Sequence, residues 1–368
     1  MNRPAAAIIL SALIALILPA CAAGKKDAGA KHILTDISQT APGTDDFWTF
    51  AAPRSQKINP AKLKAALAAV DLGNYEIHSM TIVKNGKIVM DCYGTDRQRN
   101  IKLGPNDRHE LHSVTKSITS VLLDIAIEEG KISGVTEKAL PWFSADGIKN
   151  ITREKKDMTL ENLLTMRSGL EWNEGPDDPL FFDPPNSAKA ILDRPLVGKP
   201  GTVWHYSSGN SQILGEIVRR ATGKTPRQYA DEKLFGPLGI TDYQWMADRS
   251  GTNYGGWGLF MRPRDLARFG YLCLKGGAWK GTQPVPAALL RDSTSKHSAS
   301  PWDGGDYGYH WWVPFIGGFA ARGYLGQVLY VFPEKDLVVV FTSNLDNDRA
   351  TSILDGLMTA YILPACAQ

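Results

Sequence analysis

The feature that most constrains the fold is a pair of β-hairpin patterns at opposite ends of the 368-residue chain. Near the start, the β-rich segments 79–83 and 88–94 flank Asn85-Gly86, a dipeptide typical of two-residue hairpin turns. Near the end, the apolar segments 326–332 and 337–343 are separated by a short polar loop. Strand pairs so far apart in sequence bury their apolar faces most simply in one shared sheet. We therefore predict an α/β (α+β) protein whose antiparallel sheet is built from both chain termini and flanked by helices.

The middle of the chain has a different pattern. From about residue 114 onward, helical apolar periodicity alternates with loops rich in glycine and proline. We predict an α/β sheet domain formed by residues 46–125 and 300–368, with a mainly helical domain, residues 126–299, inserted between its two parts. The aromatic segment 307–313 is a candidate for a further strand. Helices are also expected at 60–70 and 350–363.

Residues 1–23 have the pattern of an export signal, because a basic residue precedes a long apolar run that small residues close. Leu18-Pro19-Ala20-Cys21 also resembles a bacterial lipobox, in which Cys21 would carry lipid and tether the protein to a membrane. Simple cleavage after Ala22 and an uncleaved anchor are the alternatives. We expect an exported protein, in the periplasm or as an outer-membrane lipoprotein, with residues 24–45 as a tether.

Composition limits the partners of the chain. The formal net charge is only +3, and no long run of lysine and arginine occurs, so we expect no nucleic-acid partner. After Cys21, the odd number of cysteines (Cys92, Cys273 and Cys366) leaves at least one thiol unpaired, and no Cys-x-x-Cys pair occurs. His-Glu-Leu-His at 109–112 lacks the histidine spacing of helical zinc sites. We expect no metal ion and no cofactor.

Ser113 and Lys116 open a segment with the periodicity of a buried helix, and Gly130 stands where a C-terminal cap belongs. Residues three apart lie on one helix face, so the two side chains can meet. A serine hydroxyl needs a base and a nearby cation to become a nucleophile, and a helix N-terminus adds free N–H groups. The alternative is that Ser113 only caps the helix. Ser-x-x-Lys is a weak motif by itself, since a second copy at 293–296 lies in a polar stretch.

Tyr206 lies just before a second segment with buried helical periodicity, which Gly223 ends. A tyrosine at such a position is commonly a packing residue. Beside an activated serine, however, a phenolate is a suitable general base. The two segments together therefore indicate an active site more strongly than either does alone.

Five ordered segments resemble the penicillin-recognising serine hydrolases, and specifically the class C β-lactamase group, in which a tyrosine motif replaces Ser-Asp-Asn. Within this group the chain most resembles the esterases and the 6-aminohexanoate-oligomer hydrolases. The resemblance implies a serine β-lactamase/DD-peptidase-like fold and hydrolysis of a small ester, amide or peptide-like substrate through an acyl-enzyme, without a cofactor. The segments are 112–132, 160–172, 204–223, 255–281 and 323–344.

The resemblance also implies site residues. Ser113 matches the nucleophile, Lys116 the lysine that keeps serine and tyrosine activated, and Tyr206 the general base. Gly323 matches the glycine of the third motif. The backbone amides of Ser113 and Tyr324 would then hold the oxyanion. The unperturbed pKa of tyrosine, about 10, would have to be lowered by Lys116.

Two departures from the family pattern bear on the substrate. Ser208 occupies the position of the asparagine in Tyr-x-Asn, and the third motif reads Ala321-Arg322-Gly323, without the usual cation at its first position. Strand alternation predicts that Arg322 points away from that position. We therefore expect an esterase or an aminohexanoate-oligomer hydrolase.

Three alternatives remain open: a β-lactamase or DD-peptidase, a non-catalytic penicillin-binding relative, and a scaffold lipoprotein. Three carboxylates in the loop after Trp172 could hold a substrate ammonium group, or they could simply be solvated: Asp177, Asp178 and Asp183.

Overall fold

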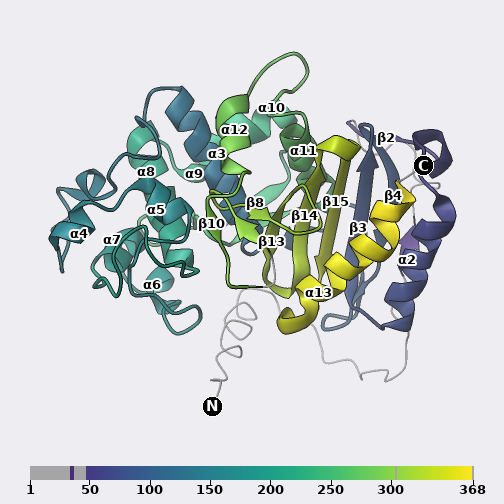
Figure 1. The fold of residues 1–368 in the computed structure, drawn as a ribbon, viewed down its shortest axis with the longest axis horizontal. Helices are drawn as coiled ribbons and strands as arrows, with labels where there is room; N and C mark the ends of the chain where they lie inside the picture. The colour runs from purple at the N-terminus through teal and green to yellow at the C-terminus, as the bar shows by residue number, and fades with distance from the viewer. Residues whose placement is uncertain (1–33, 37–46, 303–304, 367–368) are drawn as a thin grey trace.

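The computed structural model describes residues 34–36, 47–302 and 305–366. Within these ranges a ten-stranded sheet forms the right half of the molecule in Figure 1, and most helices gather at its left. Strands from both ends of the chain share this sheet, as predicted. In spatial order the main path runs β1 (Thr35–Asp36), β4 (Lys87–Tyr93), β3 (Ile77–Lys84), β15 (Leu337–Ser343), β14 (Gln327–Phe332), β13 (Phe319–Gly323), β12 (Trp312–Val313), β11 (Asp306–Tyr307) and β10 (Ser298–Ala299), and β2 (Thr49–Phe50) pairs with β4.

The centre of the sheet is the pairing of β3 with β15, which joins the two chain ends in antiparallel register. The predicted first hairpin is confirmed: Asn85 and Gly86 have φ values of 50° and 73°, the left-handed conformation that a type I′ turn requires at both positions. The predicted second hairpin is confirmed as β14–β15. The α/β (α+β) class with an antiparallel sheet is therefore confirmed.

Two expectations about strands differ from the structure. Residues 307–313 do not form one strand, because the chain turns back between β11 and β12 and the Gly308 amide donates to the Trp311 carbonyl. His310 takes a positive φ of 60° in this turn, which no continuous strand permits. Within the expected tether, Thr35–Asp36 pair with Tyr93 and Cys92 as β1. The export signal and Cys21 lie outside the described residues.

Helices cover both faces of the sheet. On one face, α2 (Pro60–Leu72) and α13 (Asn347–Leu357) bury apolar side chains against β3, β14 and β15, so both expected terminal helices are present. On the other face, α11 (Pro263–Leu274) packs on β14, β15 and β3. Helix α11 belongs to the range 126–299 that we expected to form the insert, so the sheet takes one of its covering helices from that range.

The helical region surrounds α3 (Val114–Glu128) and α8 (Ser208–Thr222), which pack against each other. There are also two short sheets: one of β5 (Thr95–Asp96) and β6 (Ile101–Lys102), which contacts β3, and one of β7 (His109–Glu110), β9 (Leu259–Met261) and β8 (Tyr243–Trp245). The remaining α-helices of the described residues are α4 (Arg153–Lys156), α5 (Leu160–Leu164), α6 (Pro179–Phe182), α7 (Ser187–Leu192), α9 (Pro226–Ala230), α10 (Gly236–Leu238), α12 (Ala287–Ser293) and α14 (Leu363–Ala365).

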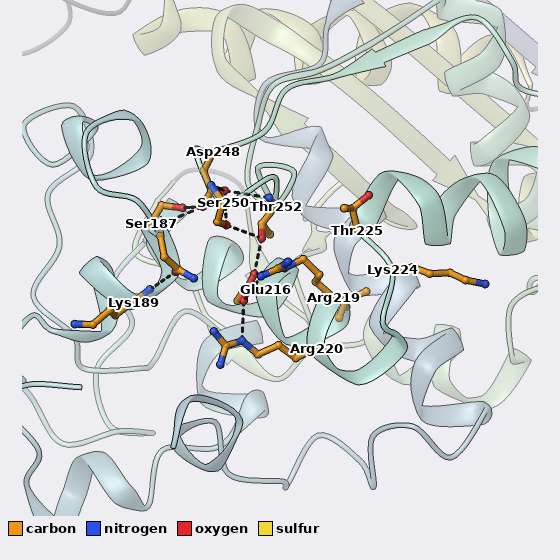
Figure 2. Close-up of polar contacts among 12 residues, drawn as sticks. Ser187, Lys189, Glu216, Arg219, Arg220, Lys224, Thr225, Asp248, Ser250 and Thr252 are labelled. Atoms are coloured by element: carbon orange, nitrogen blue, oxygen red, sulfur yellow. Dashed lines mark hydrogen bonds and ion pairs between the residues drawn. The ribbon is translucent and has the colours of Figure 1, made fainter. Parts of the chain in front are cut away.

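A buried carboxylate fixes α8 in place. Glu216 is fully buried and accepts hydrogen bonds from Arg219 and Arg220 on its own helix and from Thr252 of the loop after β8 (Figure 2). Arg220 also donates to the Trp142 carbonyl. A buried charge is tolerated only when it is paired in this way, so the network anchors the helix that follows Tyr206.

Among the described residues, no helix is both long and apolar enough to cross a membrane. Cys92, Cys273 and Cys366 are all free thiols.

Candidate active site

Ser113 immediately precedes α3, at its N-cap position, but its side chain makes no capping hydrogen bond. The simple capping role is therefore not observed. Its Oγ instead accepts a hydrogen bond from Lys116 Nζ at 2.9 Å, one helical turn along. The predicted Ser113–Lys116 contact thus exists, and the serine hydroxyl faces the lysine.

Lys116 is almost completely buried, with 1% of its surface exposed. Besides Ser113, its ammonium group contacts Ser208 Oγ at 2.9 Å and the Gly256 carbonyl at 3.0 Å. Burial lowers the pKa of Lys116 to about 8, although the carboxylates of Glu174 and Asp178 oppose this shift. A lysine in this state can accept a proton near neutral pH, which an exposed lysine cannot.

Tyr206 lies beside this pair. The Ser113 side chain interacts with its phenol group, and Lys116 Nζ is 4.9 Å from the centre of its ring. The structure thus brings together all three residues that the family resemblance singled out. The electrostatics of Tyr206 differ from our expectation, however. Burial and the nearby charge of Glu174 raise the pKa of its phenol above the usual value instead of lowering it, so a phenolate is disfavoured.

Glu174 is a site residue that the sequence did not single out. It accepts hydrogen bonds from the Ser208 amide and, at 2.9 Å, from Ser208 Oγ, and Trp172 Nε1 donates to it at 2.7 Å. Ser208, at the position of the family asparagine, thus links a carboxylate to Lys116. The available sequence signal was an acidic residue two positions after Trp172, but nothing local distinguishes Glu174 from its acidic neighbours.

The third-motif glycine lies against the start of α3. A side-chain carbon built on Gly323 would come within 2.4 Å of the Leu111 carbonyl and 3.2 Å of the Ser113 amide. Only glycine therefore lets the end of β13 approach the serine this closely. Tyr324 follows directly, so its backbone amide is the next one in the chain after the glycine that lies near the Ser113 amide. This arrangement is compatible with the predicted pair of oxyanion donors.

Arg322, on the same strand, points away from the site. Its guanidinium makes two hydrogen bonds of 3.0 Å to the carboxylate of Asp355 on α13. Arg322 therefore does not supply the cation that is missing from the first position of the third motif.

The three acidic loop residues have different surroundings. Asp178 interacts electrostatically with Lys116 and Glu174, and burial with the charge of Glu174 raises its pKa to about 6. Asp177 instead accepts from the Asn173 amide and pairs with Arg194. Asp183 ends α6, and its backbone carbonyl accepts from Arg249. Of the three, Asp178 is the one that interacts with the Ser113–Lys116 pair.

A pocket of about 500 Å³ opens beside Tyr206. Trp302 lies against Tyr206 with ring centres 4.8 Å apart, and Trp204 lies 6.1 Å from Tyr206 and 5.3 Å from Trp302. The pocket therefore has aromatic walls and one carboxylate, Glu174. Its lining consists of Asn173, Glu174, Pro176, Trp204, His205, Tyr206, Pro301 and Trp302.

Comparison with known proteins agrees with this geometry. The family model described as Beta-lactamase matches residues 67–357, most of the chain. The chain belongs to the Beta-lactamase family. It is thus a serine hydrolase of the penicillin-binding type, and the expected family resemblance is confirmed.

Relatives within the Beta-lactamase family have several activities. The chain is 26% identical to the teichoic acid D-alanine hydrolase of Staphylococcus aureus, over 88% of this chain and 86% of that protein. It is 27% identical to the 6-aminohexanoate-dimer hydrolase of Paenarthrobacter ureafaciens, over 70% and 71%. The solved structure of a family VIII carboxylesterase shares the fold, with a TM-score of 0.66 and 19% identity over 83% of this chain and 97% of that one.

Proposed function

We propose that this Beta-lactamase family member cleaves ester or amide bonds through an acyl-enzyme on Ser113. The observation that carries the proposal is the position of Lys116 Nζ, which is buried and lies 2.9 Å from both Ser113 Oγ and Ser208 Oγ. Serine becomes a nucleophile when a base of suitable pKa contacts its hydroxyl, and Lys116, with a pKa of about 8, meets this requirement.

The proton transfers follow from these contacts. Neutral Lys116 accepts the Ser113 proton while Oγ attacks the substrate carbonyl carbon. The amides of Ser113 and Tyr324 hold the oxyanion, each contributing about 3 kcal/mol in comparable hydrolases. The neutral phenol of Tyr206 donates its proton to the leaving oxygen or nitrogen as that bond breaks, and Lys116 then reprotonates Tyr206. Water repeats the same cycle on the acyl-enzyme and releases the acid.

For the substrate, we propose an ester or amide that carries a free ammonium group. Glu174 lines the pocket, and Asp178 lies close enough to interact with the same lysine. Two carboxylates near one buried lysine leave an excess of negative charge, which a substrate cation can balance. The names of two relatives, a D-alanine hydrolase and an aminohexanoate-dimer hydrolase, refer to compounds with amino groups.

Efficient β-lactam hydrolysis is the weaker alternative. Arg322 is paired with Asp355 on the far side of β13, so the third motif offers no cation for the carboxylate of a β-lactam. Rapid turnover of nitrocefin by the purified protein would reverse this preference.

The first experiment tests the nucleophile. The purified protein is treated with a fluorophosphonate probe, and the adduct is located by mass spectrometry. We expect labelling at Ser113 that is lost in Ser113→Ala and strongly slowed in Lys116→Ala. Ser295→Ala, which removes an exposed serine within the second Ser-x-x-Lys copy, should label normally. Labelling elsewhere, or none in the folded wild type, would contradict the proposal and favour a non-catalytic relative.

The second experiment tests the substrate class. Hydrolysis of the p-nitrophenyl ester of D-alanine is compared with that of its N-acetyl derivative, which lacks the charge. We expect kcat/KM to favour the free amine by roughly tenfold, as one lost ion pair would predict. Asp178→Asn should reduce this preference, whereas Asp183→Asn should preserve it. Equal kcat/KM values for the two esters in the wild type would exclude the ammonium site but would not exclude the acyl-enzyme.

We also propose that the protein is exported, because residues 1–23 have the pattern of a signal sequence. Labelling of cells with a palmitate analogue tests lipidation. Incorporation that disappears in Cys21→Ser supports a lipoprotein, and export without incorporation supports simple cleavage.

A further inference from the structure

Outside the active site, three potential metal ligands converge at the start of β3. Glu76 directly precedes this strand, His78 is its second residue, and Asp96 comes from β5. One ligand atom from each residue lies within 4.8 Å of those from the other two. Ligands around a tetrahedral zinc ion are about 3.3 Å apart, so small side-chain rotations would bring all three into coordination.

A fourth potential ligand lies near this group. His109, on β7, has its ring centre 5.6 Å from that of His78. It is 9% exposed, and its buried Nε2 has no hydrogen-bond partner among the described residues. A buried imidazole nitrogen without a partner is costly, so its presence here calls for a ligand.

The existing contacts of Glu76, His78 and Asp96 leave their ligand atoms largely available to a metal ion. His78 Nε2 is 3.4 Å from Glu76 Oε1, a long contact. Asp96 is paired with Arg99 at 3.5 Å, but the Arg99 side chain is 56% exposed and can turn into solvent. Backbone amides of Arg97 and Arg99 hold one oxygen of each carboxylate, which orients the carboxylates without neutralising them.

We propose that Glu76, His78, Asp96 and His109 bind a divalent transition-metal ion of the zinc type. Two imidazoles and two carboxylates suit Zn²⁺ or Co²⁺, whereas Mg²⁺ and Ca²⁺ prefer sites made only of oxygen ligands. Binding displaces the Arg99 side chain from Asp96. This proposal differs from our expectation that the chain holds no metal.

The ion would connect three separate elements. His78 belongs to the beginning of β3, which Glu76 directly precedes, Asp96 belongs to β5 and His109 to β7. Strand β7 leads through Leu111 to Ser113, and the Leu111 amide donates to the carbonyl of Leu259, the first residue of the paired strand β9. A metal ion here would therefore stabilise the segment that precedes the serine, without contacting the substrate pocket. The proposal does not depend on the proposed hydrolase activity.

Binding is tested with metal ions alone on the full-length protein. After treatment with a chelator, the chain is dialysed against Zn²⁺ and its metal content is measured. We expect one tightly bound ion per chain and a rise in Tm of about 3 °C or more. With Co²⁺, we expect an absorption band in the visible range typical of a tetrahedral site with nitrogen and oxygen ligands.

Variants distinguish this site from incidental binding. His78→Gln and His109→Gln should each lose the stoichiometric ion and the rise in Tm, while His297→Gln, at a histidine remote from the group, should keep both. Arg99→Ala should bind Zn²⁺ several-fold more tightly, because the competing cation is gone. The metal-free variants are first checked for folding by circular dichroism.

Two results would overturn the proposal. One is a folded wild-type protein that binds no ion at micromolar Zn²⁺. The other is unchanged Zn²⁺ affinity in His78→Gln and His109→Gln, which would place the ion on cysteines or surface groups instead. Loss of affinity in Arg99→Ala would mean that Arg99 supports the ion rather than competing with it, and would contradict the proposed displacement.

Discussion

At the residue scale, the site depends on how charge is distributed around one buried ammonium group. Lys116 has three acceptors, and one of them, Ser208 Oγ, donates its own proton to Glu174. A carboxylate is thus linked to the lysine through the hydroxyl group of Ser208. The charge of Glu174 opposes the lowering of the Lys116 pKa by burial and adds to the raising of the Tyr206 pKa, so it favours the protonated form of both groups. We infer that Glu174 sets the pH at which the serine becomes active.

The pH dependence of catalysis tests this inference. Since Lys116 must lose its proton to act as a base, kcat/KM should rise with pH and level off above about 8. Glu174→Gln removes a negative charge near Lys116, so the rise should move to lower pH by about one unit. Glu171→Gln makes the same charge change in this loop, at a residue paired with Arg194, and should leave the profile in place. Identical profiles for wild type and Glu174→Gln would contradict the inference.

At the element scale, the site is formed where the end of β13 meets the start of α3. Local sequence determines each element, but their close approach depends on the missing side chain of Gly323. Alternation along β13 directs Arg322 to the opposite face, where it pairs with Asp355 of α13. One face of β13 thus contributes to the site, and the other face holds the strand to α13 through the Arg322–Asp355 pair.

Gly323→Ala should disrupt the site with little effect elsewhere. The added carbon would come within 2.4 Å of the Leu111 carbonyl, so β13 must move away from the Ser113 amide. We expect kcat to fall about 100-fold, as when one oxyanion donor is lost. Gly356→Ala is the matched control, because nothing lies within 4 Å of its added carbon, and it should keep full activity and gain about 0.5–1 kcal/mol in stability. Unchanged kcat in Gly323→Ala would show that catalysis does not require the close contact between the end of β13 and the Ser113 amide.

At the scale of the whole molecule, the two chain ends meet in the β3–β15 pair, and the long segment between them supplies the base and the pocket. In the folded chain, Lys116 of α3 is buried against α8. Burying a cation costs stability, and a catalytic group is commonly kept despite such a cost. The cost of Lys116 should therefore be measurable in the global unfolding of the protein.

Lys116→Met, measured against pH, isolates this cost. The folded pKa of about 8 lies below the unfolded value of about 10.4. Between these values the unfolded state binds more protons, so wild-type stability should rise with pH across this window. The free energy of unfolding of the methionine variant, relative to that of wild type, should be highest below pH 8. This difference should fall by about 3 kcal/mol by about pH 10, because wild type gains that stability across the window. The hydrogen bonds lost in Lys116→Met change this stability difference by the same amount at every pH. A stability difference that does not vary with pH would therefore contradict the prediction.

The sequence by itself determined the local structure. The Asn85-Gly86 turn, the apolar stripes of α3 and α8 and the one-turn spacing of Ser113 and Lys116 depend on backbone geometry that neighbouring residues set. These patterns, with the family resemblance, were enough to predict the fold class and the residues that meet at the site.

Only the tertiary structure decided the electrostatics. The contact of Glu174 with Ser208, the separate surroundings of Asp177 and Asp178, and the raised pKa of Tyr206 depend on which charges lie near one another and how deeply they are buried. The proposed metal site at Glu76 also depends on the tertiary structure, because its ligands come from three elements that no spacing motif connects. Burial and distance are properties of the folded chain, and local periodicity does not encode them.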